Sequence, residues 1–240
     1  MTRESDIREL LDEVAELLSY IQKHYMQARE SENVKQIARP KVKSCFEHLR
    51  SCLDYLAQDL INYSRGFQSR RAQRPVYFPY GKKQEDFNNS VNRNLGNLQI
   101  SYYQLIESIQ PHKSGDSWLY DLCQIVNSNK HNQLERQSRQ NSRKSVTRLG
   151  NLVQIDESSK VVFHNCTVNG VPISNQDTLE ITGEKAVKEI KDALNIPFEV
   201  RRSYDSVRFL IRFDNRDIDI IELLSKAHHE ISHLIDQMYS

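Results

Sequence analysis

The chain has 240 residues, of which 38% are hydrophobic and 27% charged, a composition that indicates a polar but folded protein rather than a disordered one. Lys and Arg (33) nearly balance Asp and Glu (32), so no overall charge selects nucleic acid or membrane, and any basic binding surface must be local. We expect no signal peptide and no membrane span, and the four cysteines, which form no CxxC pair, indicate packed free thiols in a reducing cytoplasm.

Two long amphipathic helices are predicted first, over about residues 5–28 and 40–63, because apolar residues recur there every three or four positions. His48 and Arg50 lie off the strongest apolar stripe of the second helix, and we interpret them as rim residues. Residues 64–83 are predicted to form a loop, because prolines and glycines interrupt them. Arginines lie among aromatic residues in this loop, a combination that can bind phosphate and stack on bases: Arg70, Arg71 and Arg74. The alternative is that the aromatics pack between helices while the arginines stay in water.

A third helix is predicted over residues 84–109, in which Gly96 lowers helix stability only slightly.

A fourth helix is predicted over residues 118–131, and its apolar face ends in a polar cluster: Asn127, Asn129, Lys130 and His131. Histidine can act as a general acid or base near neutral pH, and lysine can stabilise an anionic phosphorane. The cluster would therefore suit metal-independent RNA cleavage through the 2′-hydroxyl. The alternative is a polar helix end whose amides cap the backbone.

A basic segment follows, and residues 136–148 are either a helix tail that frays into a linker or a strip that binds a phosphate backbone. In the second interpretation Arg136 and Arg139 contact the phosphates. An alternating pattern over residues 146–213 predicts a small, mostly antiparallel sheet, with a hairpin turn at Asn169-Gly170. A final amphipathic helix is predicted over about residues 217–238.

The final helix carries an H-E-x-x-H pattern, His229 to His233, of the kind that binds zinc in metalloproteases. Both histidines fall on the polar face of the helix together with charged residues, so we interpret them as solvated surface. The sequence predicts neither a metal site nor a cofactor.

These elements predict a mainly α fold, an antiparallel helical bundle with a small antiparallel β insertion before the C-terminal helix. The predicted domains are a bundle over residues 1–145, a β-rich insertion over 146–213 and a C-terminal helix over 214–240 that packs back on the bundle.

Four pieces of the chain, H-L-R-S-C-L-D-Y-L-A, V-Y-F-P, I-Q-P-H and L-C-Q-I-V-N-S-N-K-H, resemble a group of uncharacterised prokaryotic helical proteins. More distantly, the bundle and the N-S-N-K-H helix end resemble the HEPN superfamily of toxins and abortive-infection proteins. The resemblance covers about residues 40–135. It implies a dimeric ribonuclease that uses an arginine, a polar residue and a histidine. His131 matches the histidine and Asn127 the polar position, whereas no arginine occurs between Asp121 and Lys130.

We therefore expect a cytoplasmic, HEPN-like protein that binds or cleaves RNA in phage defence, a toxin–antitoxin system or a stress response, as a homodimer or with a protein partner and without a membrane. In this interpretation His131 is the acid/base, Lys130 the anion contact, and Asn127 and Asn129 position the strand. The alternative is a non-catalytic interaction module whose bundle dimerises and whose β insertion contacts a partner protein. Whether the chain is an enzyme stays open at this point. Convergence of the 65–74 loop, the 136–148 strip and His131 on one concave surface would favour RNA.

Overall fold

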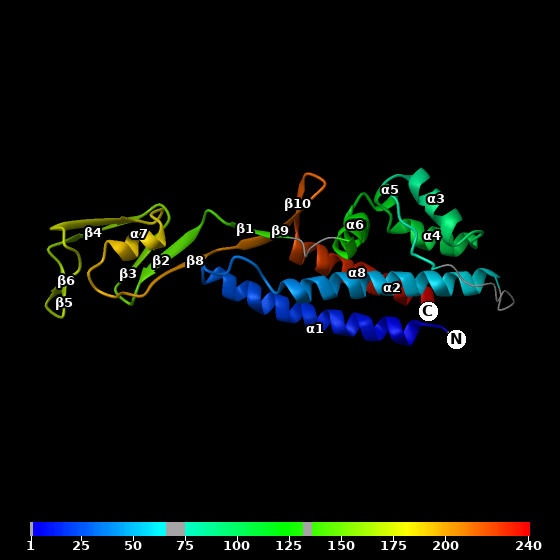
Figure 1. The fold of residues 1–240 in the computed structure, drawn as a ribbon, viewed down its shortest axis with the longest axis horizontal. Helices are drawn as coiled ribbons and strands as arrows, with labels where there is room; N and C mark the ends of the chain where they lie inside the picture. The colour runs from blue at the N-terminus through cyan, green and yellow to red at the C-terminus, as the bar shows by residue number, and fades with distance from the viewer. Residues whose placement is uncertain (1, 66–74, 132–135) are drawn as a thin grey trace. The chain divides into compact units, whose positions relative to one another are not determined.

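The computed structural model describes residues 2–65, 75–131 and 136–240, apart from the side chains of residues 64, 65 and 129–131 (Figure 1). These residues divide into two compact units. Unit 1 consists of Met1–Gln22, Ala38–Arg136 and Ile211–Ser240, and unit 2 consists of Lys23–Ile37 and Gln137–Leu210. The chain passes from one unit to the other within helix α1 (Glu4–Arg29) and within strand β9 (Val207–Phe213), so neither unit is one continuous stretch.

The fold combines helices and strands, so the prediction of a mainly α protein with a small β insertion is wrong. In the described residues, eight helices are accompanied by ten strands that form four small sheets, and helices dominate the N-terminal half. Strands already begin at β1 (Gln137–Asn141), in a polar segment without apolar alternation. The inward residue of β1, Gln137, is buried through hydrogen bonds to the backbone N–H and C=O of Ile37 (2.7 and 3.0 Å). Hydropathy therefore gave no sign of this strand.

Four long helices follow the predicted amphipathic patterns: α1, α2 (Arg39–Arg65), α6 (Trp118–His131) and α8 (Ile220–Tyr239). Within unit 1, α8 contacts α2, α4 (Ile100–Ser108) and α6, and their apolar faces form the core. The N-cap of α8 is Asp219, whose carboxylate accepts hydrogen bonds from the backbone N–H of Ile221 (3.0 Å) and Glu222 (3.2 Å). The four helix predictions are confirmed to within about three residues at their ends.

The predicted helix over residues 84–109 is instead two helices, α3 (Gln84–Asn94) and α4. Gly96 adopts a left-handed conformation, with φ of 69°, which a side chain would disfavour. The backbone N–H groups of Leu95 and Gly96 both donate to the carbonyl of Val91, at 2.8 and 3.0 Å, and so close the last turn of α3. A short helix, α5 (Pro111–Ser114), then leads towards α6.

In unit 2, β2 (Ser145–Leu149) lies between β3 (Val153–Asp156) and β8 (Val200–Tyr204) and is antiparallel to both. The next pairs are β4 (Lys160–His164) with β7 (Thr178–Thr182), and β5 (Thr167–Val168) with β6 (Val171–Pro172). The apolar core of this unit joins these strands to helix α7 (Val187–Asp192) through Leu149, Ile155, Ile173, Leu179, Ile181, Ile190 and Val200. The last strand of the chain is β10 (Arg216–Asp219), in a sheet with the order β1-β9-β10.

The predicted hairpin turn at Asn169-Gly170 is confirmed, since both residues have positive φ, 51° and 79°, between the paired strands β5 and β6. The helix-tail interpretation of residues 136–148 is wrong for the part from Gln137 onward, because this part contains β1 and the start of β2. The basic residues of this segment are therefore divided between β1, which contains Arg139, β2, which contains Arg148, and the turn between these strands, which contains Arg143 and Lys144.

Candidate functional site

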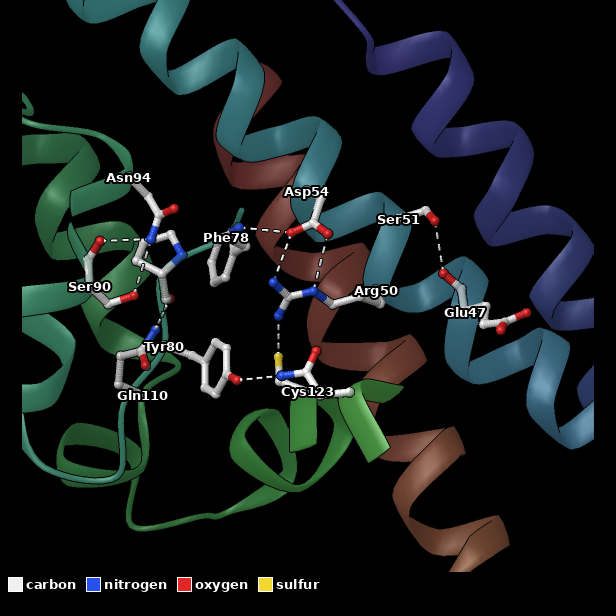
Figure 2. Close-up of polar contacts among 12 residues, drawn as sticks. Glu47, Arg50, Ser51, Asp54, Phe78, Tyr80, Ser90, Asn94, Gln110 and Cys123 are labelled. Atoms are coloured by element: carbon white, nitrogen blue, oxygen red, sulfur yellow. Dashed lines mark hydrogen bonds and ion pairs between the residues drawn. The ribbon is translucent and has the colours of Figure 1, made fainter. Parts of the chain in front are cut away.

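A buried ion pair on α2 is the centre of the polar cluster drawn in Figure 2. Arg50 and Asp54 lie four residues apart, one helical turn, and the guanidinium contacts both carboxylate oxygens at 2.9 and 3.2 Å. Arg50 is only 5% exposed, so its interpretation as a rim residue is wrong. Desolvation acts to lower the pKa of Arg50, but the neighbouring Cys123 and Asp54 outweigh it and raise that pKa, so the side chain stays charged. A buried cation of this kind needs its partner, because an uncompensated charge is costly to bury.

Asp54 also fixes the segment that leads into α3. Its carboxylate accepts a hydrogen bond from the backbone N–H of Phe78 at 2.8 Å, and the Phe78 ring is buried. A second buried side chain, Gln110, accepts from the N–H of Gly81 and donates to the carbonyl of Pro79, both at 3.2 Å. No Cβ would fit at Gly81, because it would lie 2.3 Å from the backbone nitrogen of Phe87. Residues 78–81 are therefore held from both sides.

Cys123, on α6, receives the other end of the guanidinium, with 2.6 Å between Nη1 of Arg50 and Sγ. Burial raises the pKa of the Cys123 thiol to about 11, although Arg50 acts to lower it. The thiol is thus protonated at neutral pH and is poorly suited to act as a nucleophile. Its contact with Arg50 joins α6 to α2 instead.

Tyr80 connects the buried Arg50 to the exposed Asn127. The guanidinium of Arg50 lies 5.3 Å from the centre of the Tyr80 ring, and Asn127 donates a hydrogen bond from Nδ2 to the Tyr80 hydroxyl at 3.0 Å. Burial raises the pKa of Tyr80, so the hydroxyl keeps its proton at neutral pH. Since the Tyr80 hydroxyl oxygen accepts a hydrogen bond from Asn127, the hydroxyl can donate its own proton to a different acceptor.

A second tyrosine lies edge-on beside the first. The rings of Tyr80 and Tyr120 are 6.1 Å apart at an interplanar angle of 65°, and the ammonium of Lys82 lies 5.9 Å from the centre of the Tyr120 ring. Asn127 and Lys82 are exposed, whereas both tyrosines are half-buried. We call these four residues, Tyr80, Lys82, Tyr120 and Asn127, the Tyr80–Tyr120 surface.

The structure places the predicted catalytic residues at the end of α6, whose backbone remains helical to His131. Asn127 is the member with a described side chain, and it contacts Tyr80 as stated above. The side chains of Asn129, Lys130 and His131 lie outside the described residues. The same holds for the predicted nucleic-acid contacts in the loop, Arg70, Arg71 and Arg74.

The two remaining predicted contacts belong to different units. Arg136 is exposed at the end of a segment of unit 1. Arg139, in unit 2, uses its guanidinium within the protein: it donates to the carbonyls of Ser31, Val34 and Ala28 at 2.6, 2.7 and 2.9 Å. Desolvation lowers the pKa of Arg139. Its donors satisfy carbonyls at and after the end of α1, and this occupies the groups that a phosphate would need.

The H-E-x-x-H pattern on α8 shows no arrangement of metal ligands. His229 and His233 are exposed, and Glu230 forms an ion pair with Lys226 at 3.2 Å. Among the residues that the structure describes, no group of three or more His, Cys, Asp or Glu side chains could hold a metal ion.

Sequence reasoning missed the Arg50–Asp54–Tyr80 connection. Its one local signal was the spacing of Arg50 and Asp54 on a helix, which is common on solvated surfaces. The contacts with Tyr80 and Cys123 join residues far apart in the chain and left no pattern in the sequence.

Comparison with known proteins gives no match to this chain, whether with protein-family models, curated proteins or solved structures. In the described part of the chain, no helix is both long enough and apolar enough to cross a membrane. Function is therefore inferred from the contacts around Tyr80 and Asn127.

Proposed function

We propose that this protein binds single-stranded RNA at the Tyr80–Tyr120 surface. The main observation is that two half-buried aromatic rings lie beside an exposed lysine and an exposed amide: Lys82 lies over Tyr120, and Asn127 donates a hydrogen bond to Tyr80. Aromatic side chains beside cationic groups bind single strands because bases stack on the rings while the cations attract the backbone. The Tyr80 hydroxyl and the Asn127 amide add hydrogen-bonding groups that can reach base edges or the 2′-hydroxyl.

The buried cluster supports this proposal by holding the surface in place. Tyr80 lies in a segment fixed by Asp54 and Gln110, and the guanidinium of Arg50 lies 5.3 Å from the centre of its ring. A pre-positioned tyrosine loses little conformational entropy when a base stacks on it, and binding gains accordingly. Arg50 in this scheme positions Tyr80 and does not itself contact the strand.

On the basis of the distant resemblance to HEPN proteins, we also propose that the protein is cytoplasmic, forms a dimer and acts in phage defence or a stress response. Cleavage would be the task of His131, one helical turn after Asn127, with Lys130 as the anion contact and Asn129 as a second positioning amide. Cys123 is not assigned a catalytic role, because its thiol is protonated at neutral pH.

The test is fluorescence anisotropy with a short labelled single-stranded RNA, at low and high salt, on wild type and single variants. We expect Tyr120→Ala to weaken binding by about 5- to 150-fold, the effect of losing one stacked base. Lys82→Ala should weaken binding less and reduce its salt dependence. The chain offers a matched control, since Lys41 lies over the ring of Tyr20 at 4.6 Å elsewhere in unit 1. Tyr20→Ala and Lys41→Ala should leave affinity unchanged.

If the variants of Tyr20 and Lys41 lose as much RNA affinity as those of Tyr120 and Lys82, binding at the Tyr80–Tyr120 surface is refuted. If wild type binds no RNA, the proposed function is refuted and the interaction module is favoured. Cleavage is measured in the same samples with EDTA present. Wild-type cleavage that His131→Ala abolishes, with binding retained, would assign the catalytic role to His131. Binding without cleavage would make the protein a non-catalytic RNA binder.

A further inference from the structure

Strand β8 of unit 2 has an open edge, because β2 is its one strand neighbour among the described residues. The backbone N–H of Gly150 donates to the carbonyl of Glu199 at 2.8 Å, on the side that faces β2. Successive residues of a strand direct their backbone groups to opposite edges, so residues 199, 201 and 203 bond to β2. Val200 and Arg202 therefore direct their N–H and C=O groups away from β2, to the open edge.

These backbone groups of Val200 and Arg202 have no hydrogen-bond partner among the described residues. Both residues are nevertheless buried, with exposed fractions of 4% and 8%. Buried backbone groups are almost always paired, because an unpaired one costs as much free energy as a lost hydrogen bond. The outer edge of β7 differs, since Thr178 and Glu180, which direct their backbone groups away from β4, are exposed, and water can satisfy them. Of these two open edges, the edge of β8 is the one that requires a further partner.

A groove of about 430 Å³ lies at this edge. Its lining comes from three parts of unit 2: residues 30–33 after α1, Val187 and Lys191 of α7, and residues 199–202 at the start of β8. We call it the β8 groove. Its volume is towards the lower end of the range for binding sites, about 300–1,000 Å³, so it accommodates a few residues of one extended chain rather than a folded domain.

The charged side chains of the β8 groove are paired within the protein, with two exceptions. The guanidinium of Arg202 donates to two backbone carbonyls at 2.8 and 2.6 Å, and Arg201 pairs with Glu199. Lys191 on α7 and Glu30 after α1 are exposed and have no ion pair within the described residues. A ligand with one acidic and one basic side chain matches these two. The whole lining holds three carboxylates and three cationic groups, so it attracts neither a polyanion nor a polycation.

We propose that the β8 groove binds an extended segment of a partner protein, which adds as a further strand to the sheet β3-β2-β8. The N–H and C=O groups of Val200 and Arg202 repeat at the two-residue period of a strand, and the ligand that matches this period is another extended backbone. Lys191 and Glu30 select among such segments by charge. A nucleic acid strand lacks the peptide groups that the edge requires, and the balanced charge of the lining does not attract its phosphates. The proposal concerns unit 2 and is independent of the RNA-binding surface in unit 1.

The test uses two fluorescein-labelled peptides of about seven residues, in which valine and threonine alternate between a terminal lysine and a terminal glutamate, in either order. Binding to the full chain is followed by fluorescence anisotropy. We expect saturable binding of at least one peptide. N-methylation of its internal amides keeps every side chain but removes the backbone donors, and it should weaken binding by about fivefold or more, the effect of losing two backbone hydrogen bonds.

Hydrogen exchange of single amides, read by NMR, locates the bound peptide. The amides of Val200 and Arg202 should exchange more slowly when the peptide is bound, because they then donate to its carbonyls. The amides of Thr178 and Glu180, on the open edge of β7, are the internal control and should keep their exchange rates.

Charge reversal tests the selection by side chains. Lys191→Glu should weaken binding of the preferred peptide by about 1.5- to 5-fold, as expected for one exposed ion pair, and a peptide whose glutamate is replaced by lysine should recover the loss. Lys188→Glu is the matched control, because Lys188 is an exposed lysine of the same helix that does not line the β8 groove. It should leave affinity unchanged.

Several results would overturn the proposal. They are no binding of either peptide, equal binding of the N-methylated form, and slower exchange at Thr178 and Glu180 instead of Val200 and Arg202. Slower exchange at Val200 with a single-stranded RNA but with neither peptide would assign the β8 groove to nucleic acid. A wild-type dimer that the peptide dissociates would assign it to a second copy of the chain. Tyr120→Ala should leave peptide binding unchanged, so failure of this proposal and failure of the proposed function are distinguishable.

Discussion

Removing the carboxylate of Asp54 tests the buried cluster directly. In Asp54→Ala, the guanidinium of Arg50 would stay buried without its anion, and the backbone N–H of Phe78 would lose its acceptor. Breaking a buried ion pair from one side costs about 3–5 kcal/mol. An unsatisfied buried N–H costs about 1–3 kcal/mol, but the Asp54 side chain is 18% exposed and water can reach this site, so we expect a total of about 3–5 kcal/mol.

The assay is urea denaturation followed by the fluorescence of Trp118, the single tryptophan of the chain, which is buried in unit 1 and therefore reports on that unit. With a slope of ~2–3 kcal/mol per molar urea, a loss of about 4 kcal/mol lowers the midpoint by about 1.3–2 M. The double variant Arg50→Met/Asp54→Leu should recover most of the loss, because it removes both buried charges.

The control is Glu47→Ala on the same helix. Glu47 pairs with Lys43 at 3.5 Å, but both side chains are more than a third exposed. Removing the Glu47 carboxylate should therefore change the free energy of unfolding by only about 0.3–0.5 kcal/mol, the usual contribution of an exposed pair of this spacing. If Asp54→Ala costs no more than Glu47→Ala, the account of Arg50 as a buried cation that depends on Asp54 is refuted.

Two further predictions concern the thiols. Burial raises the pKa of the Cys52 thiol from 9.0 to about 12 and that of Cys123 from 9.0 to about 11, so above pH 9 the unfolded chain releases protons that the folded chain retains. The free energy of unfolding should therefore be constant below pH 9 and fall as the pH rises towards 12. Urea midpoints measured across this range should fall less steeply in Cys52→Ala than in wild type. Cys166 is the exposed thiol of four, so a thiol-specific reagent should modify one group per native chain rapidly, and Cys166→Ser should abolish this fast phase; persistence of the fast phase would show that a thiol of α2 or α6 is accessible.

The long helices could be predicted because their information is local. The apolar residues of α1, α2, α6 and α8 repeat at helical spacing over many turns, and each helix buries the face that this repeat defines. The turn at Asn169-Gly170 was equally local, since both residues tolerate the positive φ that the hairpin requires.

The break after α3 and the strand β1 could not be predicted with the same means. Gly96 costs a helix only about 1 kcal/mol relative to alanine, so the sequence alone does not decide between a weak point and an end. Gln137 is buried by exchanging two hydrogen bonds with Ile37, a partner 100 positions away. Such pairings leave no periodic signal.

At the candidate site, the helix end containing Asn127 was found from the sequence, but its partner Tyr80 was not. Tyr80 reaches Asn127 because Asp54 and Gln110 hold the preceding segment, and these contacts span 24 and 31 positions. The turn between α3 and α4 was missed for the same reason as the helix break, since Asn97 and Leu98 were assigned to a continuous helix.

The interleaving of the two units sets an order of completion during synthesis. All of unit 2 has been translated once Leu210 is made, whereas unit 1 still lacks Ile211–Ser240. That last segment contains α8, which supplies seven buried residues to its unit: Ile220, Leu223, Leu224, Ala227, Ile231, Leu234 and Ile235. At ~5–20 residues per second the ribosome needs about 1.5–6 s to make it. During this interval the apolar faces of α2 and α6 are present without the helix that covers them, so the chain exposes apolar surface that it buries once α8 has been made.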